Sequence, residues 1–390
     1  MNDTVRQFRD FFVSLRLTVV LLTLSMLLIF AATLDQVNLG IGAVQAKWFH
    51  SLFVLWRLPH SDFTLPVFPG GYLLGAFLLA NLIAAHVYRF QLSWKKCGIF
   101  LTHLGLVVLL LGEFFSGLLQ QETRMEFREG EAKSYSESYD RNELAILNTT
   151  DPQFDTVVAV PESLLADGAA IQHPALPFRV ITKAYYPNAA FAMRGAGKDE
   201  PASLATAGVG PQVVLTPLAQ TYKQDERNTP AAFIELAGPE GSLGTWLVTP
   251  QLPAPQTFDY AGRTWRLALR PERTYRPFTL TLVKATHDVY PGTDIPKNFS
   301  SRLRLTTPDG RVDREVLIYM NNPLRFGGLT FYQQTMDSET NTSGLQVVHN
   351  PGWIMPYVAC ILMALGLVLQ FGLHLLGFIG KRTAASAAKS

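Results

Sequence analysis

Cysteine is scarce in this chain of 390 residues, which contains only Cys97 and Cys360. The two thiols lie far apart in sequence, so they form neither a C-x-x-C redox pair nor a C-x-x-C-H haem-attachment motif. The chain also lacks an H-E-x-x-H zinc motif, a glycine-rich phosphate loop and a Ser/His/Asp grouping. The sequence therefore predicts neither thiol chemistry nor a self-contained enzyme.

Charge is the second shortage. Charged residues make up 16% of the chain, whereas soluble domains carry roughly 25%. The formal net charge of +2 provides no basic field that would neutralise phosphates, so no nucleic-acid partner is expected. The hydrophobic share of 48% is concentrated in a few uncharged runs.

Four apolar runs are long enough to cross a bilayer as helices, which takes about 20 residues. They cover residues 17–34, 70–88, 98–119 and 353–380. The basic residues before the first run also fit a signal peptide. That run is longer than a signal peptide's apolar core, and two further runs follow closely, so a permanent membrane anchor is favoured.

The distribution of Lys and Arg predicts the orientation of these spans, because cytoplasmic flanks carry the excess of positive charge. Basic residues precede the first run, separate the second from the third and follow the fourth: Arg6, Arg9, Arg16, Arg89, Lys95, Lys96, Lys381, Arg382 and Lys389. The loop of residues 35–69 holds only Lys47 and Arg57. Both termini, including the tail 381–390, are thus predicted to be cytoplasmic. The aromatic stretch 48–56 is expected along the outer membrane surface.

This organisation predicts a membrane domain over residues 1–119 and a large outer domain over residues 120–352. The outer region contains short β-branched runs, such as 178–182, 212–216 and 303–307, bounded by Gly- and Pro-containing turns. No long helical periodicity appears, so an antiparallel sandwich or open barrel is predicted. Residues 186–210 are rich in Ala and Gly and are expected to form a long loop.

Histidines inside apolar runs are functional candidates, because burying an ionisable group in a membrane is costly. His103 lies about 10 Å along its helix from Lys96. His86 and His374 lie near the cytoplasmic ends of their own runs and would be at broadly similar depth. The alternative for each is a hydrogen-bonded imidazole between helices, and from the residues alone this is favoured for His86 and His374. Nearby Gly105 would let a neighbouring helix approach closely in either case.

The outer domain offers weaker candidates. His173, His287 and His349 are scattered without metal-ligand spacing. The stretch around Asn322 is expected to form a turn and to have no role in catalysis.

Several segments together resemble one known family. They are Ser14-Leu15-Arg16-Leu17, His103-Leu104-Gly105, Phe127-Arg128-Glu129-Gly130-Glu131, Ile295-Pro296-Lys297-Asn298-Phe299-Ser300-Ser301, Asn321-Asn322-Pro323-Leu324-Arg325-Phe326-Gly327-Gly328 and Pro351-Gly352-Trp353. The chain thereby resembles the ResB-like (CcsB-type) proteins of cytochrome c biogenesis, system II, over residues 12–130 and 278–380. Two departures are a short loop between the second and third runs and Asn322, where some relatives have His.

The resemblance implies a haem-handling, non-catalytic subunit of a cytochrome c synthase in a bacterial inner membrane, with the large domain in the periplasm. His103 matches the family's intramembrane histidine and would be an axial ligand of the iron of haem b, with His86 and His374 as further haem contacts. A CcsA/ResC-type polytopic protein would supply a Trp-rich haem-binding segment, since the six tryptophans here are dispersed, and apocytochrome c would receive the haem. A structural scaffold or chaperone without haem contact is the alternative, and a transporter subunit ranks last.

Overall fold

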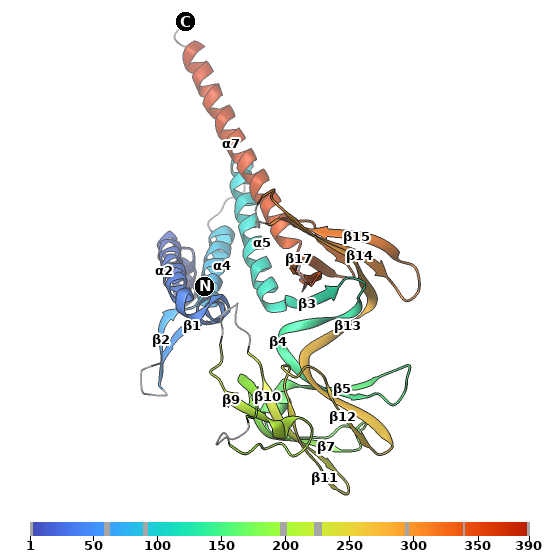
Figure 1. Cartoon of the computed structure of the whole chain (residues 1–390). Helices are drawn as coiled ribbons and strands as arrows, with labels where there is room; N and C mark the ends of the chain where they lie inside the picture. Colours follow the sequence, from blue (N-terminus) through green and yellow to red (C-terminus); the bar gives the residue numbers. More distant parts are fainter. Residues whose placement is uncertain are drawn as a thin grey trace. The chain divides into compact units, whose positions relative to one another are not determined.

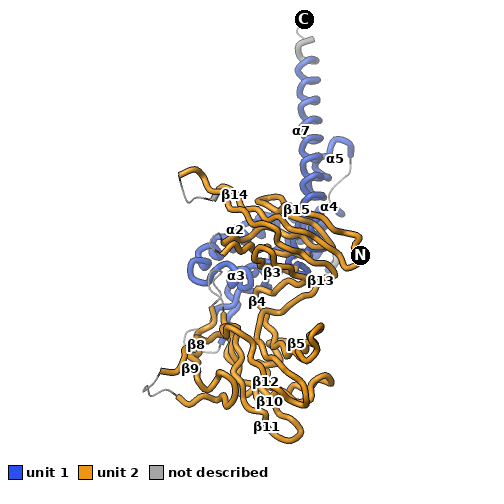
Figure 2. The backbone as a smooth tube through the Cα atoms, turned by 45° about the vertical axis from the view of Figure 1, so that its right-hand side comes forward, with its two compact units in different colours: residues 1–120, 222–226, 350–390 blue, residues 121–221, 227–349 orange. Residues whose placement is uncertain are grey.

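The computed structural model describes residues 3–57, 63–88, 93–195, 201–221, 228–292, 296–337 and 340–387. The chain divides into two compact units (Figure 2). The helical unit comprises residues 1–120, 222–226 and 350–390, and the β unit comprises residues 121–221 and 227–349. Of the residues used to predict orientation and resemblance, Arg89, Lys389 and Ile295 lie outside the described residues.

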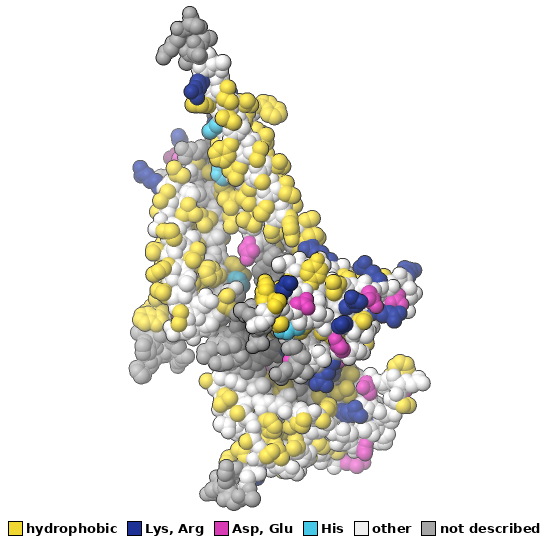
Figure 3. All heavy atoms as spheres, turned by 45° about the horizontal axis from the view of Figure 1, so that its top comes forward, with side chains coloured by type: hydrophobic (Ala, Val, Ile, Leu, Met, Phe, Trp, Pro, Cys, Tyr) yellow, Lys and Arg dark blue, Asp and Glu magenta, His cyan; other side chains and the backbone are white. Residues whose placement is uncertain are grey.

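The helical unit contains four helices that are long and apolar enough to cross a membrane: α2 (Leu15–Leu39), α4 (Gly71–Tyr88), α5 (Cys97–Leu119) and α7 (Met355–Ala387) (Figure 1). Hydrophobic side chains cover the visible face of these helices, whereas charged side chains gather over the strands (Figure 3). This distribution is expected where lipid rather than water surrounds a helix. The predicted fold class, with four apolar helices and an antiparallel β domain, is confirmed.

Shorter elements complete the helical unit. They are α1 (Asp3–Phe12), α3 (Ile41–Val44), the π-helical turn η1 (Gln45–Phe49), the hairpin β1 (Phe53–Arg57) and β2 (Thr64–Pro69), and the 3-10 turn η2 (Trp94–Lys96). Asp35 near the end of α2 accepts hydrogen bonds of 2.7 Å from both Lys47 Nζ and Trp48 Nε1. These bonds hold η1 against α2. The aromatic stretch 48–56 is thus part helical turn and part strand, and its location on the membrane surface stays a prediction.

Helix α5 packs against α7 through a stripe of glycines on α5. Gly98, Gly105 and Gly112 recur every seventh residue on α5, opposite Gly366, Ala359 and Met355. A Cβ atom on Gly105 would lie 2.8 Å from the Ala359 carbonyl oxygen and 2.6 Å from Met363 Cγ. A seven-residue repeat keeps one stripe facing a partner helix along its length, and small residues let the two backbones approach closely.

A buried amide joins α4 to the break between α1 and α2. Asn81 is 3% exposed and donates to the carbonyl oxygens of Phe12 (2.6 Å) and Ser14 (3.2 Å). Its own oxygen accepts a 2.7 Å bond from Thr18 Oγ1. The break between α1 and α2 leaves backbone carbonyls without helical partners, and lipid cannot hydrogen-bond to them. The Asn81 side chain supplies these hydrogen bonds and thereby aligns α4 with α2.

The β unit is antiparallel throughout its described pairs and is built on two long strands. Its strands are β3 (Gln121–Arg128), β4 (Ala132–Asn148), β5 (Thr156–Pro161), β6 (Ala170–Ile171), β7 (Arg179–Tyr186), β8 (Ala189–Met193), β9 (Val213–Pro217), β10 (Ala231–Gly238), β11 (Gly241–Val248), β12 (Gln256–Tyr260), β13 (Arg263–Val289), β14 (Pro296–Thr306), β15 (Asp313–Tyr319), β16 (Leu324–Phe326), β17 (Leu329–Asp337) and β18 (Thr342–His349). A short helix, α6 (Glu162–Ala166), follows β5, and a 3-10 turn, η3 (Gly210–Gln212), precedes β9.

One end of β4 and β13 contributes to a nearly closed barrel. The sheet order is β15-β14-β13-β4-β3-β18-β17-β16, and a bridge between Tyr319 and Asn322 joins its two ends. Alternate side chains of these strands point inward, as strand geometry requires, and Phe127 and Phe331 are fully buried among them. The turn predicted at Asn322 closes this barrel.

The other end of the same two strands forms a sandwich. Here β5, β4, β13 and β12 lie side by side, and their inner face packs against that of the sheet β11-β10-β7-β6. Trp265, 1% exposed, lies in this core with its ring centroid 5.2 Å from that of Phe178. The predicted classes, sandwich and open barrel, are therefore both present in one unit.

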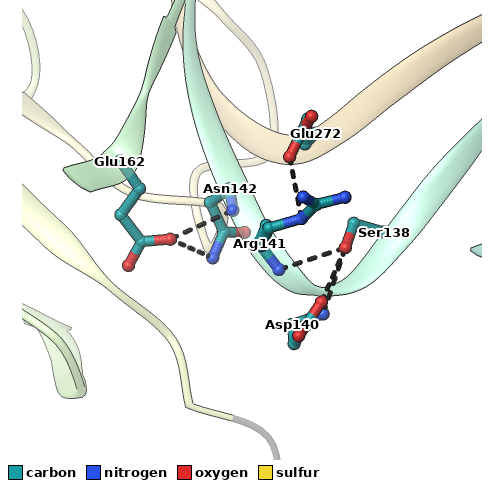
Figure 4. A network of polar contacts seen from close by, with 6 residues as sticks. All are labelled: Ser138, Asp140, Arg141, Asn142, Glu162 and Glu272. Atoms are coloured by element: carbon teal, nitrogen blue, oxygen red, sulfur yellow. Dashed lines mark hydrogen bonds and ion pairs between the residues drawn. The ribbon is translucent and has the colours of Figure 1, made fainter. Parts of the chain in front are cut away.

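Between the barrel and the sandwich, β4 bulges away from β13. Four residues of β4, 138–141, lie opposite the single residue Glu272 of β13. Ser138 Oγ accepts from the backbone N–H of Arg141 at 3.2 Å, and Arg141 Nε lies 3.0 Å from Glu272 Oε2 (Figure 4). Next to the bulge, Asn142 donates two bonds to Glu162 Oε2. These contacts satisfy the polar groups that a bulge removes from the ladder.

The prediction of a long loop over residues 186–210 is wrong in part. Residues 189–193 form β8, which pairs with β9 in a separate two-stranded sheet. The backbone N–H groups of Thr206 and Ala207 both donate to the Thr245 carbonyl on β11. Small residues suit this close backbone approach, so the Ala/Gly composition reflects packing against an edge strand.

Candidate functional site

The structure brings two of the three predicted histidines into contact. His86 on α4 and His103 on α5 have ring centroids 4.7 Å apart and ring planes at 68°. Both side chains are half-buried. Phe100, one turn before His103, lies 6.3 Å from the His86 ring.

The pair lies at the junction between two better-packed sets of helices. Helix α5 is packed along α7 through its glycines, and α4 is tied to α1 and α2 through Asn81. Contacts between α4 and α5 are few by comparison. The two imidazoles thus meet where α4 and α5 make far fewer contacts than α5 makes with α7.

Hydrogen bonding fixes the proton position of one ring. His86 Nδ1 lies 2.9 Å from the Leu82 carbonyl oxygen. A carbonyl only accepts hydrogen bonds, so Nδ1 carries the proton and Nε2 is the nitrogen with the lone pair in the neutral ring. Metal-ligating histidines are commonly oriented in this way, by donating their second nitrogen to a carbonyl.

The second ring is less constrained. His103 Nδ1 is enclosed and makes no hydrogen bond within geometric limits to any described residue, although the carbonyl of Ile99, one turn earlier, lies near the ring. A buried polar nitrogen without a hydrogen bond is costly. The His103 ring would therefore gain stability from an added ligand or hydrogen-bond partner.

His374 is engaged elsewhere. Its Nε2 lies 3.0 Å from Gln370 Nε2, and an amide nitrogen only donates, so this imidazole nitrogen accepts the bond. Gln370 also accepts from the backbone N–H of Ile99 (3.3 Å) and donates to the Lys95 carbonyl (3.4 Å). His374 therefore belongs to a polar network at the start of α5, and no contact with His86 or His103 is found among the described residues.

The spacing of the pair limits how it binds a flat ligand. With metal–nitrogen bonds of about 2 Å, two imidazoles on opposite sides of one iron have centroids about 6 Å apart. The 4.7 Å separation of His86 and His103 leaves no room for a porphyrin plane between them. The arrangement seen here thus fits one iron ligand from this chain, and the ligand assignments of all three histidines stay predictions.

A second aromatic cluster, which the sequence analysis did not single out, lies elsewhere in the helical unit. His50 stacks on Tyr72 with ring centroids 5.5 Å apart, and Tyr72 meets Phe114 edge-on at 6.1 Å. The only sequence signal was the aromatic stretch in the first loop. Three distant segments supply these residues, so no local spacing reveals the cluster.

The outer histidines form no common site. His287 stacks on Phe299, His173 Nδ1 accepts from the backbone N–H of Ala175, and His349 ends β18. Among the described residues, no group of three or more His, Cys, Asp or Glu side chains is arranged to hold a metal ion.

Together these features define a membrane protein with four candidate spanning helices, a large antiparallel β unit and a histidine pair between helices. Residues 255–342, which run from β12 to the start of β18, match the model of the ResB-like family. A stretch of 102 residues is 33% identical to Protein NrfI of Wolinella succinogenes, covering 26% of this chain and 11% of that relative. The chain is thus similar to the ResB-like family over part of its β unit, and it spans only about a tenth of the length of the relative that it matches. The family match lies in the β unit and does not include the histidine pair.

Proposed function

We propose that this chain is a haem-handling subunit of a cytochrome c synthase complex, in which His103 provides one axial bond to the haem iron. The observation that carries the proposal is the His86–His103 contact between two apolar helices of a ResB-like protein. Haem is the cargo in this account. The helices carry it across the membrane, and the complex presents it for attachment to apocytochrome c.

The donor set is suited to this cargo. Imidazole nitrogens are common ligands of haem iron, and the apolar surroundings of the pair suit a porphyrin face. Because His86 and His103 are too close to clamp one iron, a second subunit would supply the opposite ligand. His86, whose ring rests edge-on to His103, is a positioning residue that restricts the rotation of the ligand.

The same proposal includes the membrane arrangement inferred from charge. Both termini would be cytoplasmic, residues 120–352 periplasmic and residues 353–380 the fourth span of a bacterial inner-membrane protein. A CcsA/ResC-type polytopic subunit is the partner that completes the site.

The test is the haem content of the purified chain with its copurifying subunits. We expect His103→Ala to lose most of the bound haem absorbance and His103→Gly to regain it with added imidazole, since free imidazole replaces the missing ring. His173→Ala, which removes a histidine of the β unit that bonds only locally to the Ala175 backbone, is the control and should retain haem. Normal haem content and normal cytochrome c maturation in His103→Ala would contradict the proposal.

A scaffold function is the second candidate, because the segment that matches the family lies in the β unit. In that case, disrupting the β unit would abolish cytochrome c maturation while His103→Ala would leave both haem and maturation unchanged. Measuring both variants in one strain separates the two functions.

A further inference from the structure

Charged residues are rare in the four long helices, and two of them are acidic. Asp35 lies one turn before the end of α2 and is neutralised by Lys47 through an ion pair of 2.7 Å. Glu113 lies six residues before the end of α5. Its side chain is exposed and forms no ion pair or hydrogen bond with any described residue. Because a charge within a span is costly unless it is paired, Glu113 lacks what Lys47 gives to Asp35.

The position of Glu113 on α5 makes water hard for its carboxylate to reach. Six residues of α-helix correspond to about 9 Å. The polar groups at this end of the helical unit begin only at Ser116, whose hydroxyl accepts a 3.0 Å bond from Asn350. Side chains of a helix lean toward its N-terminus. The carboxylate of Glu113 therefore leans away from the nearer end of the span and toward its middle.

Glu113 continues an apolar stripe on α5. Ile99 and Leu106, fourteen and seven residues earlier, are each 37% exposed. Seven residues bring a helix back to nearly the same face, so these three side chains lie along one side of α5. That side is rotated by about 100° from the glycines that face α7. The stripe of Ile99, Leu106 and Glu113 is therefore separate from the contact with α7, and it is exposed.

We propose that the stripe of Ile99, Leu106 and Glu113 is the docking surface for a transmembrane helix of the second subunit, and that a Lys or Arg of that helix pairs with Glu113. The apolar residues would provide close contact, and the ion pair would fix the register of the two helices. A basic residue is the complementary group, because it removes the cost of an unpaired carboxylate in a span. The inference rests on the proposed function for the existence of a second membrane subunit, and it requires nothing of the histidines.

A second copy of this chain does not supply the pairing group. The basic residues of its four long helices are Arg16, Lys381 and Arg382, and the distribution of charge predicts all three at the cytoplasmic side. Glu113 lies near the opposite end of its span. A symmetric interface brings the same patch of both copies together, so two Glu113 carboxylates would face each other and repel. A different protein with a basic residue in its span is the better occupant.

The first test is photocross-linking in native membranes, which uses the full chain with Glu113 intact. A photoreactive phenylalanine analogue replaces Leu106 in one strain and Leu104 in another. Both leucines are 37% exposed, but they lie on nearly opposite sides of α5, since two residues turn a helix by about 200°. We expect position 106 to cross-link to a span of another membrane protein that contains Lys or Arg, identified by mass spectrometry. Position 104 should not reach that span.

Charge reversal then tests the ion pair. Glu113→Lys should reduce copurification of the cross-linked subunit by about tenfold or more, because two like charges would meet in the interface. Glu113→Gln keeps an oxygen that accepts hydrogen bonds and should cause a smaller loss. Changing the basic residue of the partner's span to Glu should restore copurification with Glu113→Lys. Glu240→Lys, on the exposed turn between β10 and β11, is the control and should copurify as the natural chain does.

Three results would each overturn the proposal. They are cross-links from position 106 only to lipid or to a second copy of this chain, a cross-linked span without Lys or Arg, and equal copurification with Glu113→Lys and Glu240→Lys. The cross-linking result decides the matter where Glu113→Lys fails to insert. Haem content of the same samples separates the two proposals. A natural chain that copurifies with the subunit but without haem contradicts the haem role alone, whereas normal haem with any of the three results contradicts the docking surface alone.

Discussion

The two units of this protein are stabilised in different ways, and the comparison explains where each tolerates change. The β unit buries apolar side chains in three clusters, and water is the solvent that drives this burial. The helical unit buries few large side chains. Its helices are aligned by the glycines of α5 and by the amide of Asn81, because apolar burial gives little advantage over lipid. Close fit of the backbones and hydrogen bonds therefore determine how the helices pack, whereas the burial of apolar surface stabilises the β unit.

The largest effect on stability is expected from truncating a side chain in the barrel core. The side chain of Phe331 is fully buried, with 0% of its surface exposed to solvent. Phe331→Ala should therefore reduce the free energy of unfolding by about 3–5 kcal/mol. Chemical denaturation of the full chain in detergent measures this. Leu317→Ala, which truncates an exposed side chain of β15, is the control and should cost far less. Equal losses would contradict the role assigned to the barrel core.

A smaller effect is expected from enlarging a helix-packing glycine. Gly105→Ala places a methyl group 2.8 Å from the Ala359 carbonyl and should separate α5 from α7 at a cost of about 1–3 kcal/mol. Gly75→Ala adds the same group where no atom lies within 4 Å and should be neutral or slightly stabilising. Thermal unfolding in detergent compares the two variants, and a neutral Gly105→Ala would show that the glycine stripe is not needed for packing.

The smallest effect concerns pH. Burial alone raises the pKa of Glu131, but the Arg128 backbone N–H and the Lys133 ammonium outweigh it and hold the pKa below its usual value. A carboxyl whose pKa is lower in the folded than in the unfolded state stabilises the folded protein at pH values above its unfolded pKa. This stabilisation is lost as the pH falls through the folded pKa. Glu131→Gln should thus reduce stability at neutral pH by at most about 1 kcal/mol and flatten its dependence below about pH 4.5. An unchanged pH profile in this variant would contradict the assignment.

Several features were predictable because they depend on local sequence. The uncharged runs predicted all four long helices, and the β-branched runs with their turns predicted an antiparallel β domain. The loop predicted at 186–210 was wrong in part because composition does not reveal that Thr206 and Ala207 bond to a strand distant in sequence. The grouping of three histidines was predicted only from similar depth, and depth along a helix axis does not specify which helix faces which.

The sequence by itself determined that this chain has apolar helices, a β unit and a resemblance to the ResB-like family, because hydropathy and motifs are local properties. Tertiary structure decided that His86 meets His103 and that His374 bonds to Gln370 instead. These outcomes depend on helix rotation and strand order, which arise from contacts between segments far apart in the chain.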